Sequence, residues 1–132
     1  MTRAFLLAAA CIGLAGCNAG GGAPNANLPA MNVAFTWCSG TPAFTIGNIP
    51  ATAKMLSFRM IDQQAPGYNH GGGTVPASGK ATQTIPCGGL SGSYTGPNPP
   101  PPQIHDYQWT VTALDAGGQP VAAGRATRKF PE

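Results

Sequence analysis

Residues 94–115 constrain the fold more than any other part of the sequence. The segment holds Gly96 and then prolines throughout 97–102, interrupted only by Asn98. Because proline fixes φ and lacks an amide N–H, this run predicts a rigid loop and excludes a helix or a central strand. From His105 onward, apolar and polar residues alternate with the period of two that a β-strand requires. The segment therefore predicts a shaped loop that leads into a core strand.

The rest of the composition fits the same architecture. Among its 132 residues the chain has 19 Gly and 14 Pro, and only 8% of the residues are charged, against about 25% in ordinary domains. Solvated helix faces usually carry Lys and Glu, so this composition favours short strands and loops, an all-β fold in a single domain. The net charge of +3 is spread out and includes no basic run, which excludes nucleic acid as a partner.

The N-terminal residues have the pattern of an export signal. A positive charge at Arg3 precedes an apolar run over 4–14, which is too short to span a bilayer as a helix. The following residues, Leu-Ala-Gly-Cys at 14–17, resemble the lipobox of bacterial lipoproteins, in which the cysteine is lipidated. The alternative is an ordinary secretory signal that leaves Cys17 unmodified. The organisation expected is therefore a signal peptide at 1–16, a lipidated Cys17 that begins a flexible tether over 17–30, and a folded domain at 31–132.

Export also decides the interpretation of the cysteines. Cys11 leaves with the signal peptide and Cys17 carries the lipid, so the domain retains Cys38 and Cys87. Two thiols outside the cytosol are expected to form a disulfide, and two separate buried thiols are the alternative. By resemblance to lipoprotein sorting, Asn18 after the cysteine favours the outer membrane of a bacterial cell envelope, with the domain facing the periplasm.

Alternation and turn signals divide the domain into strands. Strands are predicted at 33–37, 43–46, 55–61, 80–86, 105–113 and 120–130, and no helical pattern of useful length follows the signal. Three consecutive glycines at 71–73 allow a close backbone approach or positive φ, and this region is predicted to be an irregular loop.

The alternation of residues along two predicted strands indicates where a site could lie. Asp62 falls on the same face as the apolar residues at 56, 58 and 60, and His105 and Tyr107 begin the buried face of the later strand. If these two strands are antiparallel neighbours, Asp62 meets His105 and Tyr107 at one edge of the core. The loop that contains His70 and the proline-rich loop leave from that same edge and would form the walls of a small pocket.

The groups expected in this pocket suit an anionic oxygen. Imidazole N–H, phenol O–H and backbone N–H groups of glycine-rich turns are all donors, and a carboxylate beside a histidine orients the ring and favours its protonated form. Each residue also has a purely structural interpretation. A histidine beside an aromatic strand is often a satisfied core residue, a strand-terminal aspartate often caps a turn, and tyrosines often belong to the core.

Two motifs in this region resemble signatures of the phosphatidylethanolamine-binding protein family, and most closely its bacterial Raf-kinase-inhibitor-like branch. Residues 94–100, Tyr-Thr-Gly-Pro-Asn-Pro-Pro, with His-Asp-Tyr at 105–107, are similar to the second signature, Tyr-x-Gly-Pro-x-Pro-Pro followed by His-Arg-Tyr. Residues 62–66, Asp-Gln-Gln-Ala-Pro, resemble the first signature, Asp-Pro-Asp-x-Pro, and His70 resembles the histidine that follows it. The resemblance covers roughly residues 35–131.

The resemblance implies an antiparallel β-sandwich with a small anion-accepting pocket at one end. This pocket takes phosphate, phosphorylated head groups or carboxylates, and needs no cofactor. The ligand-binding residues implied for this chain are Asp62, His70, Tyr94, Gly96, His105 and Tyr107. The sequence departs from the family pattern at three positions, with Gln64 in place of an Asp, Gly71 in place of a frequent Trp and Asp106 in place of an Arg.

The function expected is therefore binding without turnover. The sequence describes an exported, lipid-anchored module that binds a small anionic or phosphorylated ligand, including a phospholipid head group. One alternative is an envelope interaction protein with a vestigial pocket. Another is a hydrolase, against which stand the absence of a Gly-x-Ser-x-Gly motif and the lack of any zinc-like spacing of the two histidines in the sequence.

Overall fold

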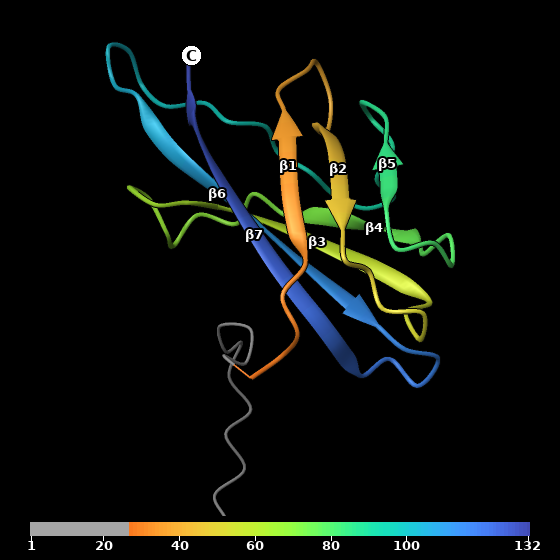
Figure 1. The fold of residues 1–132 in the computed structure, drawn as a ribbon. Coiled ribbons are helices and arrows are strands. Elements are labelled where there is room, and N and C mark those ends of the chain that lie inside the picture. The colour runs from red at the N-terminus through yellow and green to blue at the C-terminus, as the bar shows by residue number, and fades with distance from the viewer. Residues whose placement is uncertain (1–26) are drawn as a thin grey trace, which may run out of the picture.

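The structure is a computed structural model that describes residues 27–132 (Figure 1). The predicted signal peptide at 1–16, Cys17 with its predicted lipid, and the tether as far as residue 26 lie outside the described residues. Within 27–132 the chain has no helix, and so none that could cross a membrane. The strands are β1 (Asn32–Thr36), β2 (Ala43–Gly47), β3 (Met55–Asp62), β4 (Gly72–Pro76), β5 (Gln83–Ile85), β6 (His105–Leu114) and β7 (Pro120–Phe130).

These strands form two antiparallel sheets. One sheet has the order β1-β2-β5 and the other has the order β4-β3-β6-β7. The three-stranded sheet lies across the four-stranded sheet (Figure 1). Aromatic side chains join the two layers, since the ring centroid of Phe44 in β2 lies 4.8 Å from that of Phe58 in β3 and 5.1 Å from that of Trp109 in β6. The all-β class predicted from composition and alternation is therefore confirmed.

The predicted parity of β3 and β6 is also confirmed. Residues at alternating positions of β6, from His105 to Ala113, are buried, and β3 buries alternate residues as far as Asp62. The two strands pair antiparallel in a register that places Asp62 opposite Tyr107. The end of β3 and the start of β6 are thus neighbours at one end of the four-stranded sheet.

The prediction of an irregular loop at 71–73 was wrong in part, because Gly72 and Gly73 begin β4. This strand pairs with β3, Gly72 opposite Arg59. A Cβ atom at Gly72 would collide with the Phe58 carbonyl oxygen, so only glycine allows the strands to approach this closely. Gly71, with φ of 72°, makes the turn into the strand. Strand propensity fails here because the close approach is a tertiary requirement.

Two connections hold the three-stranded sheet in place. Cys38, in the turn after β1, forms a disulfide with Cys87 after β5, with Cα atoms 6.1 Å apart, so the predicted pairing is confirmed. On the other side, the Met31 amide donates to the Ala123 carbonyl (2.8 Å), and the Ala123 amide donates to Pro29 (3.0 Å). Residues 29–31 are therefore hydrogen-bonded to β7.

Candidate functional site

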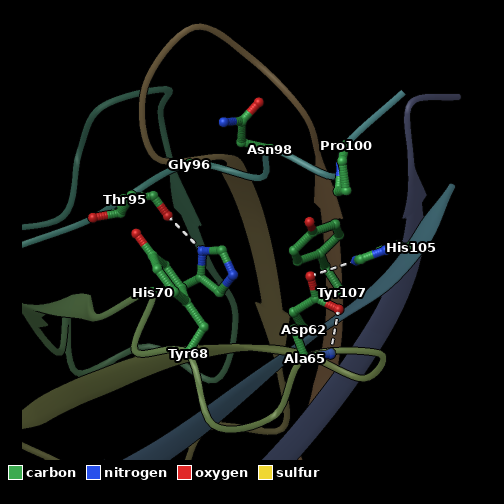
Figure 2. A pocket seen from close by; sticks show the side chains of 10 residues that line it. All are labelled: Asp62, Ala65, Tyr68, His70, Thr95, Gly96, Asn98, Pro100, His105 and Tyr107. Carbon is green, nitrogen blue, oxygen red and sulfur yellow. Dashed lines mark hydrogen bonds and ion pairs between the residues drawn. The ribbon is translucent and has the colours of Figure 1, made fainter. Parts of the chain in front are cut away.

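A cavity of about 240 Å³ lies where β3 ends and β6 begins (Figure 2). The loop after β3 forms one wall, and the proline-rich loop before β6 forms another. Figure 2 shows Tyr68 and His70 on one side of the cavity and Asp62, Tyr107 and His105 on the other. The lining residues are Asp62, Ala65, Tyr68, His70, Thr95, Gly96, Asn98, Pro100, His105 and Tyr107.

Asp62 occupies the base of the cavity, with only 3% of its surface exposed. Its Oδ2 lies 2.7 Å from Nδ1 of His105, and its Oδ1 accepts the backbone amides of Gln64 (2.9 Å) and Ala65 (3.1 Å). The carboxylate therefore caps the turn after β3 and also fixes the ring of His105. The structural and the functional interpretations of Asp62 are both compatible with this geometry.

The surroundings of Asp62 favour its charged form. Burial raises the pKa of this carboxyl, but hydrogen bonds from His105 and the two backbone amides, together with the nearby Tyr107 hydroxyl, lower it by more. The pKa of Asp62 consequently lies below its ordinary value. The one carboxylate of the cavity is thus ionised at neutral pH, with its charge shared among several donors.

Tyr107 brings an unpaired hydroxyl to the same place. The residue is fully buried, and its hydroxyl makes no hydrogen bond of good geometry with any residue in 27–132. Asp62 and the Asn98 amide nevertheless lie close enough to influence it. Burial first, and then the neighbouring Asp62 carboxylate with its negative charge, raise the pKa of Tyr107 to about 12. The phenol therefore keeps its proton and can donate to an acceptor in the cavity.

His70 faces this group from the opposite wall. Its Nδ1 lies 2.9 Å from the Thr95 carbonyl oxygen, which only accepts, so Nδ1 carries a proton and donates. The ring packs against Tyr68, with centroids 4.6 Å apart, and meets Tyr107 edge-on at 5.4 Å. These contacts fix the ring, and its other nitrogen points toward the cavity (Figure 2).

His105 is bonded at both ring nitrogens. Besides the bond to Asp62, its Nε2 lies 2.8 Å from Oε1 of Gln103. Gln103 lies two residues earlier in the proline-rich loop, and sequence analysis did not identify it. The alternation of β6 begins at His105, so nothing in the pattern indicated where the Gln103 side chain points.

Five of the six predicted binding residues line the cavity, and Tyr94 does not. Its ring packs on Trp109 with centroids 5.6 Å apart, and its hydroxyl is buried without a hydrogen-bond partner among the described residues. Burial raises the pKa of Tyr94 to about 12. Tyr94 therefore belongs to the packing beneath the site. The lining residues that sequence analysis did not select are Ala65, Tyr68, Thr95, Asn98 and Pro100.

Asp106 lies on the other face of β6, as parity predicts. Its carboxylate pairs with Lys129 Nζ at 2.9 Å and accepts from the Gln64 side chain at 3.1 Å. The hydrogen bond from Lys129, together with that from Gln64, lowers the pKa of Asp106. The negative charge that stands in place of an Arg is thus directed away from the cavity and has its own cation.

Within residues 27–132 no group of three or more His, Cys, Asp or Glu side chains is placed to hold a metal ion. Around this small space the structure places the Tyr107 phenol, which can donate, and a ring nitrogen of His70, which accepts in the neutral ring and donates in the protonated one.

Comparison with models of known protein families found no family that matches this chain. Comparison with curated proteins found no match, and comparison with solved structures found none either.

Proposed function

We propose that this protein binds a small ligand through a phosphate or carboxylate group and releases it chemically unchanged. The observation that carries the proposal is the unpaired hydroxyl of Tyr107, which is fully buried in the wall of the cavity. A buried donor without a partner costs free energy, on the order of 1–3 kcal/mol, which a ligand acceptor would recover. The fixed ring of His70 on the facing wall supplies a second group directed at the same space.

The charge of Asp62 does not oppose an anion in this cavity. Its two oxygens already accept from His105 and from two backbone amides, so its charge is compensated within hydrogen-bond distance. What remains accessible to a ligand is the Tyr107 hydroxyl and the free ring nitrogen of His70. The carboxylate thus acts as the residue that positions His105.

The signature-like motifs support the same proposal. We propose that the two sheets form a β-sandwich of the phosphatidylethanolamine-binding protein type and that the cavity is its anion pocket. Five of the residues implied by the resemblance, Asp62, His70, Gly96, His105 and Tyr107, line this cavity. The ligand class proposed is accordingly phosphate, a phosphorylated head group or a carboxylate.

The cellular setting is part of the proposal. The lipobox-like residues at 14–17 support a lipid anchor at Cys17 and a position in a bacterial cell envelope, at the outer membrane and facing the periplasm. The short distance in sequence between Cys17 and Pro29, which is hydrogen-bonded to β7, would keep the domain near that membrane. A soluble ligand or a lipid head group would both be within reach.

Titration of the full chain with phosphate, phosphoethanolamine and acetate, followed by NMR at the two histidine rings, tests this function. Saturable shifts at His70 and His105 are expected, with acetamide as the uncharged control. The absence of any shift at millimolar ligand would contradict the proposal. Hydrolysis of phosphoethanolamine that is lost in His105→Ala would instead indicate an enzyme.

Tyr107→Phe provides a sharper prediction, because Tyr94→Phe is a matched control. Both substitutions remove a buried hydroxyl that has no hydrogen-bond partner in the described chain, but only Tyr107 lines the cavity. We expect Tyr107→Phe to raise the Kd for phosphate by about three- to tenfold, the value of one hydrogen bond, and Tyr94→Phe to leave it unchanged. Calorimetric titration measures both. An equal change in the two variants would show that the hydroxyl acts through packing.

A further inference from the structure

Neighbouring aromatic rings line the cavity from the protein surface inward. The ring centroids of Tyr68 and His70 are 4.6 Å apart, and those of His70 and Tyr107 are 5.4 Å apart. Figure 2 shows His70 between the two tyrosines. Tyr68 is 55% exposed, whereas His70 and Tyr107 are buried. The ring of Tyr68 therefore borders the opening of the cavity and has surface that a ligand can cover.

The cavity is larger than an anionic group requires. Its volume of about 240 Å³ corresponds to about eight water molecules of about 30 Å³ each. A carboxylate has two oxygens and a phosphate four, so either group fills about half of this space or less. Ala65, Pro100 and the ring of Tyr68 provide carbon atoms around the remainder. Cavities for drug-sized ligands measure about 300–1,000 Å³, so this smaller one has room for about one apolar ring beside the anionic group.

The charges around the cavity favour an anion with a single charge. Among the described residues that line it, none is Lys or Arg. Arg128 of β7 is the register partner of Tyr107, but its guanidinium pairs with Glu132 and donates to the Phe35 carbonyl. Proteins usually compensate the two charges of a phosphate with Arg, Lys or several backbone amides, because an uncompensated buried charge is costly. A carboxylate has one charge and needs fewer donors.

We propose that the ligand of this pocket is a small organic carboxylate with one flat apolar ring, whose carboxylate accepts from the Tyr107 hydroxyl and whose ring lies against Tyr68. This inference rests on the proposed function and narrows its ligand class. Aromatic rings that pack offset or edge-to-face gain free energy beyond the area they bury. The contact of Tyr68 with His70 orients the tyrosine ring before the ligand arrives.

Four probes, titrated into the full chain by calorimetry, separate the contribution of the anionic group from that of the ring. They are acetate, benzoate, inorganic phosphate and phenyl phosphate, used at about pH 8, where the phosphate groups carry two charges. We expect the Kd of benzoate to be about three- to tenfold lower than that of acetate, and phenyl phosphate to gain similarly over phosphate. Benzoate is expected to bind most tightly of the four.

Variants of Tyr68 test where the ring of the probe lies. Tyr68→Ala should bring the Kd of benzoate to that of acetate, and Tyr68→Phe should preserve the difference. Ile104→Ala is the matched control, because Ile104 is 56% exposed but does not line the cavity. The ratio of the two Kd values is the readout, since a loosened His70 would weaken both probes alike. Nuclear Overhauser contacts between benzoate and Tyr68 ring protons give a second measurement.

The outcomes distinguish this inference from the proposed function. If the added ring gives no gain in either pair of probes, or if the gain persists in Tyr68→Ala, the inference is overturned while binding of any probe leaves the proposed function in place. Tighter binding of phenyl phosphate than of benzoate would overturn the choice of a carboxylate. If none of the four probes binds at millimolar concentration, the proposed function itself fails.

Discussion

At the scale of single residues, the site depends on a buried carboxylate that is fully hydrogen-bonded. Asp62 receives the His105 ring and two backbone amides, and it lies beside the hydroxyl of Tyr107. A buried charge is tolerated only with such partners, and removal of one partner leaves the others unsatisfied. Asp62 is therefore a residue on which both the local fold and the orientation of the pocket depend.

The shifted pKa of Asp62 predicts a pH dependence of stability. Its folded-state pKa lies below the ordinary value of 3.8, so the unfolded chain binds the proton more readily. The resulting stabilisation is fully present above about pH 4 and is lost as the pH falls through the folded-state pKa. We expect Asp62→Asn to lower the free energy of unfolding at pH 7 by about 1–3 kcal/mol and to flatten its pH dependence in that acid window. Urea denaturation between pH 2 and pH 7 measures both effects.

Asp106→Asn is the control for this prediction. The pKa of Asp106 is also lowered, first by the hydrogen bond from Lys129, but this pair is on the solvated face of the sheet. Exposed ion pairs contribute little to stability, so a smaller change is expected. An equal flattening in the two variants would mean that the acid sensitivity does not arise in the cavity.

At the scale of elements, the antiparallel pair β3 and β6 assembles the site. Asp62 is the last residue of β3, and its register partner Tyr107 lies two residues from His105 on the same face of β6. Side chains opposite one another across such a pair are about 4.5–5.5 Å apart at Cβ. A slip of one residue would turn His105 and Tyr107 to the solvated face, so the hydrophobic pattern that fixes the register also fixes the site.

The strand β4 supports this pair through a glycine. A Cβ atom at Gly72 would meet the Phe58 carbonyl oxygen, whereas one at Gly67 would meet nothing within 4 Å. We expect Gly72→Ala to destabilise the protein by about 1–3 kcal/mol, because a backbone atom cannot move aside as a side chain can. Gly67→Ala should change stability by less than about 0.5 kcal/mol. Thermal and urea denaturation compare the two, and equal stabilities would show that β4 is free to shift away from β3.

At the scale of the whole molecule, two small sheets share one core. The core residues come from both layers, and the rings of Phe44, Phe58 and Trp109 meet at their interface. The disulfide Cys38–Cys87 closes a sequence separation of 49 within the three-stranded sheet, whose last strand, β5, has only three residues. Neither cysteine lines the cavity.

Removal of the disulfide should therefore lower the free energy of unfolding without changing the affinity for the ligand. In the chain-entropy account a closed loop of this length stabilises the fold by about 4 kcal/mol, and measured values are often smaller. We expect the double variant Cys38→Ala with Cys87→Ala to lose about 2–4 kcal/mol, while its Kd for phosphate stays that of wild type at temperatures where it is folded. Thermal denaturation and calorimetric titration test the two parts. Weaker phosphate binding by the folded variant would show that the three-stranded sheet shapes the pocket.

The sequence by itself determined the properties that depend on local order along the chain. Alternation with a period of two placed Asp62, His105 and Tyr107 on buried faces, and the prolines defined a rigid loop before His105. The number of cysteines that remain after the predicted signal peptide and lipobox was enough to predict the pair Cys38–Cys87. Each of these follows from the conformational preferences or the count of residues that are read directly from the sequence.

Only the tertiary structure decided how these local pieces meet. Packing alone decides several contacts in and around the site. Examples are the pairing of Asp62 with Tyr107, the glycine strand β4, the packing of Tyr94 on Trp109 and the contact of Gln103 with His105. No periodic pattern in the sequence indicates the order of the strands or the direction of side chains in loops. Both are selected by the free energy of the whole core. For that reason the strand residues of the pocket were predictable, whereas half of the ten lining residues, most of them in the loops, were not selected from the sequence.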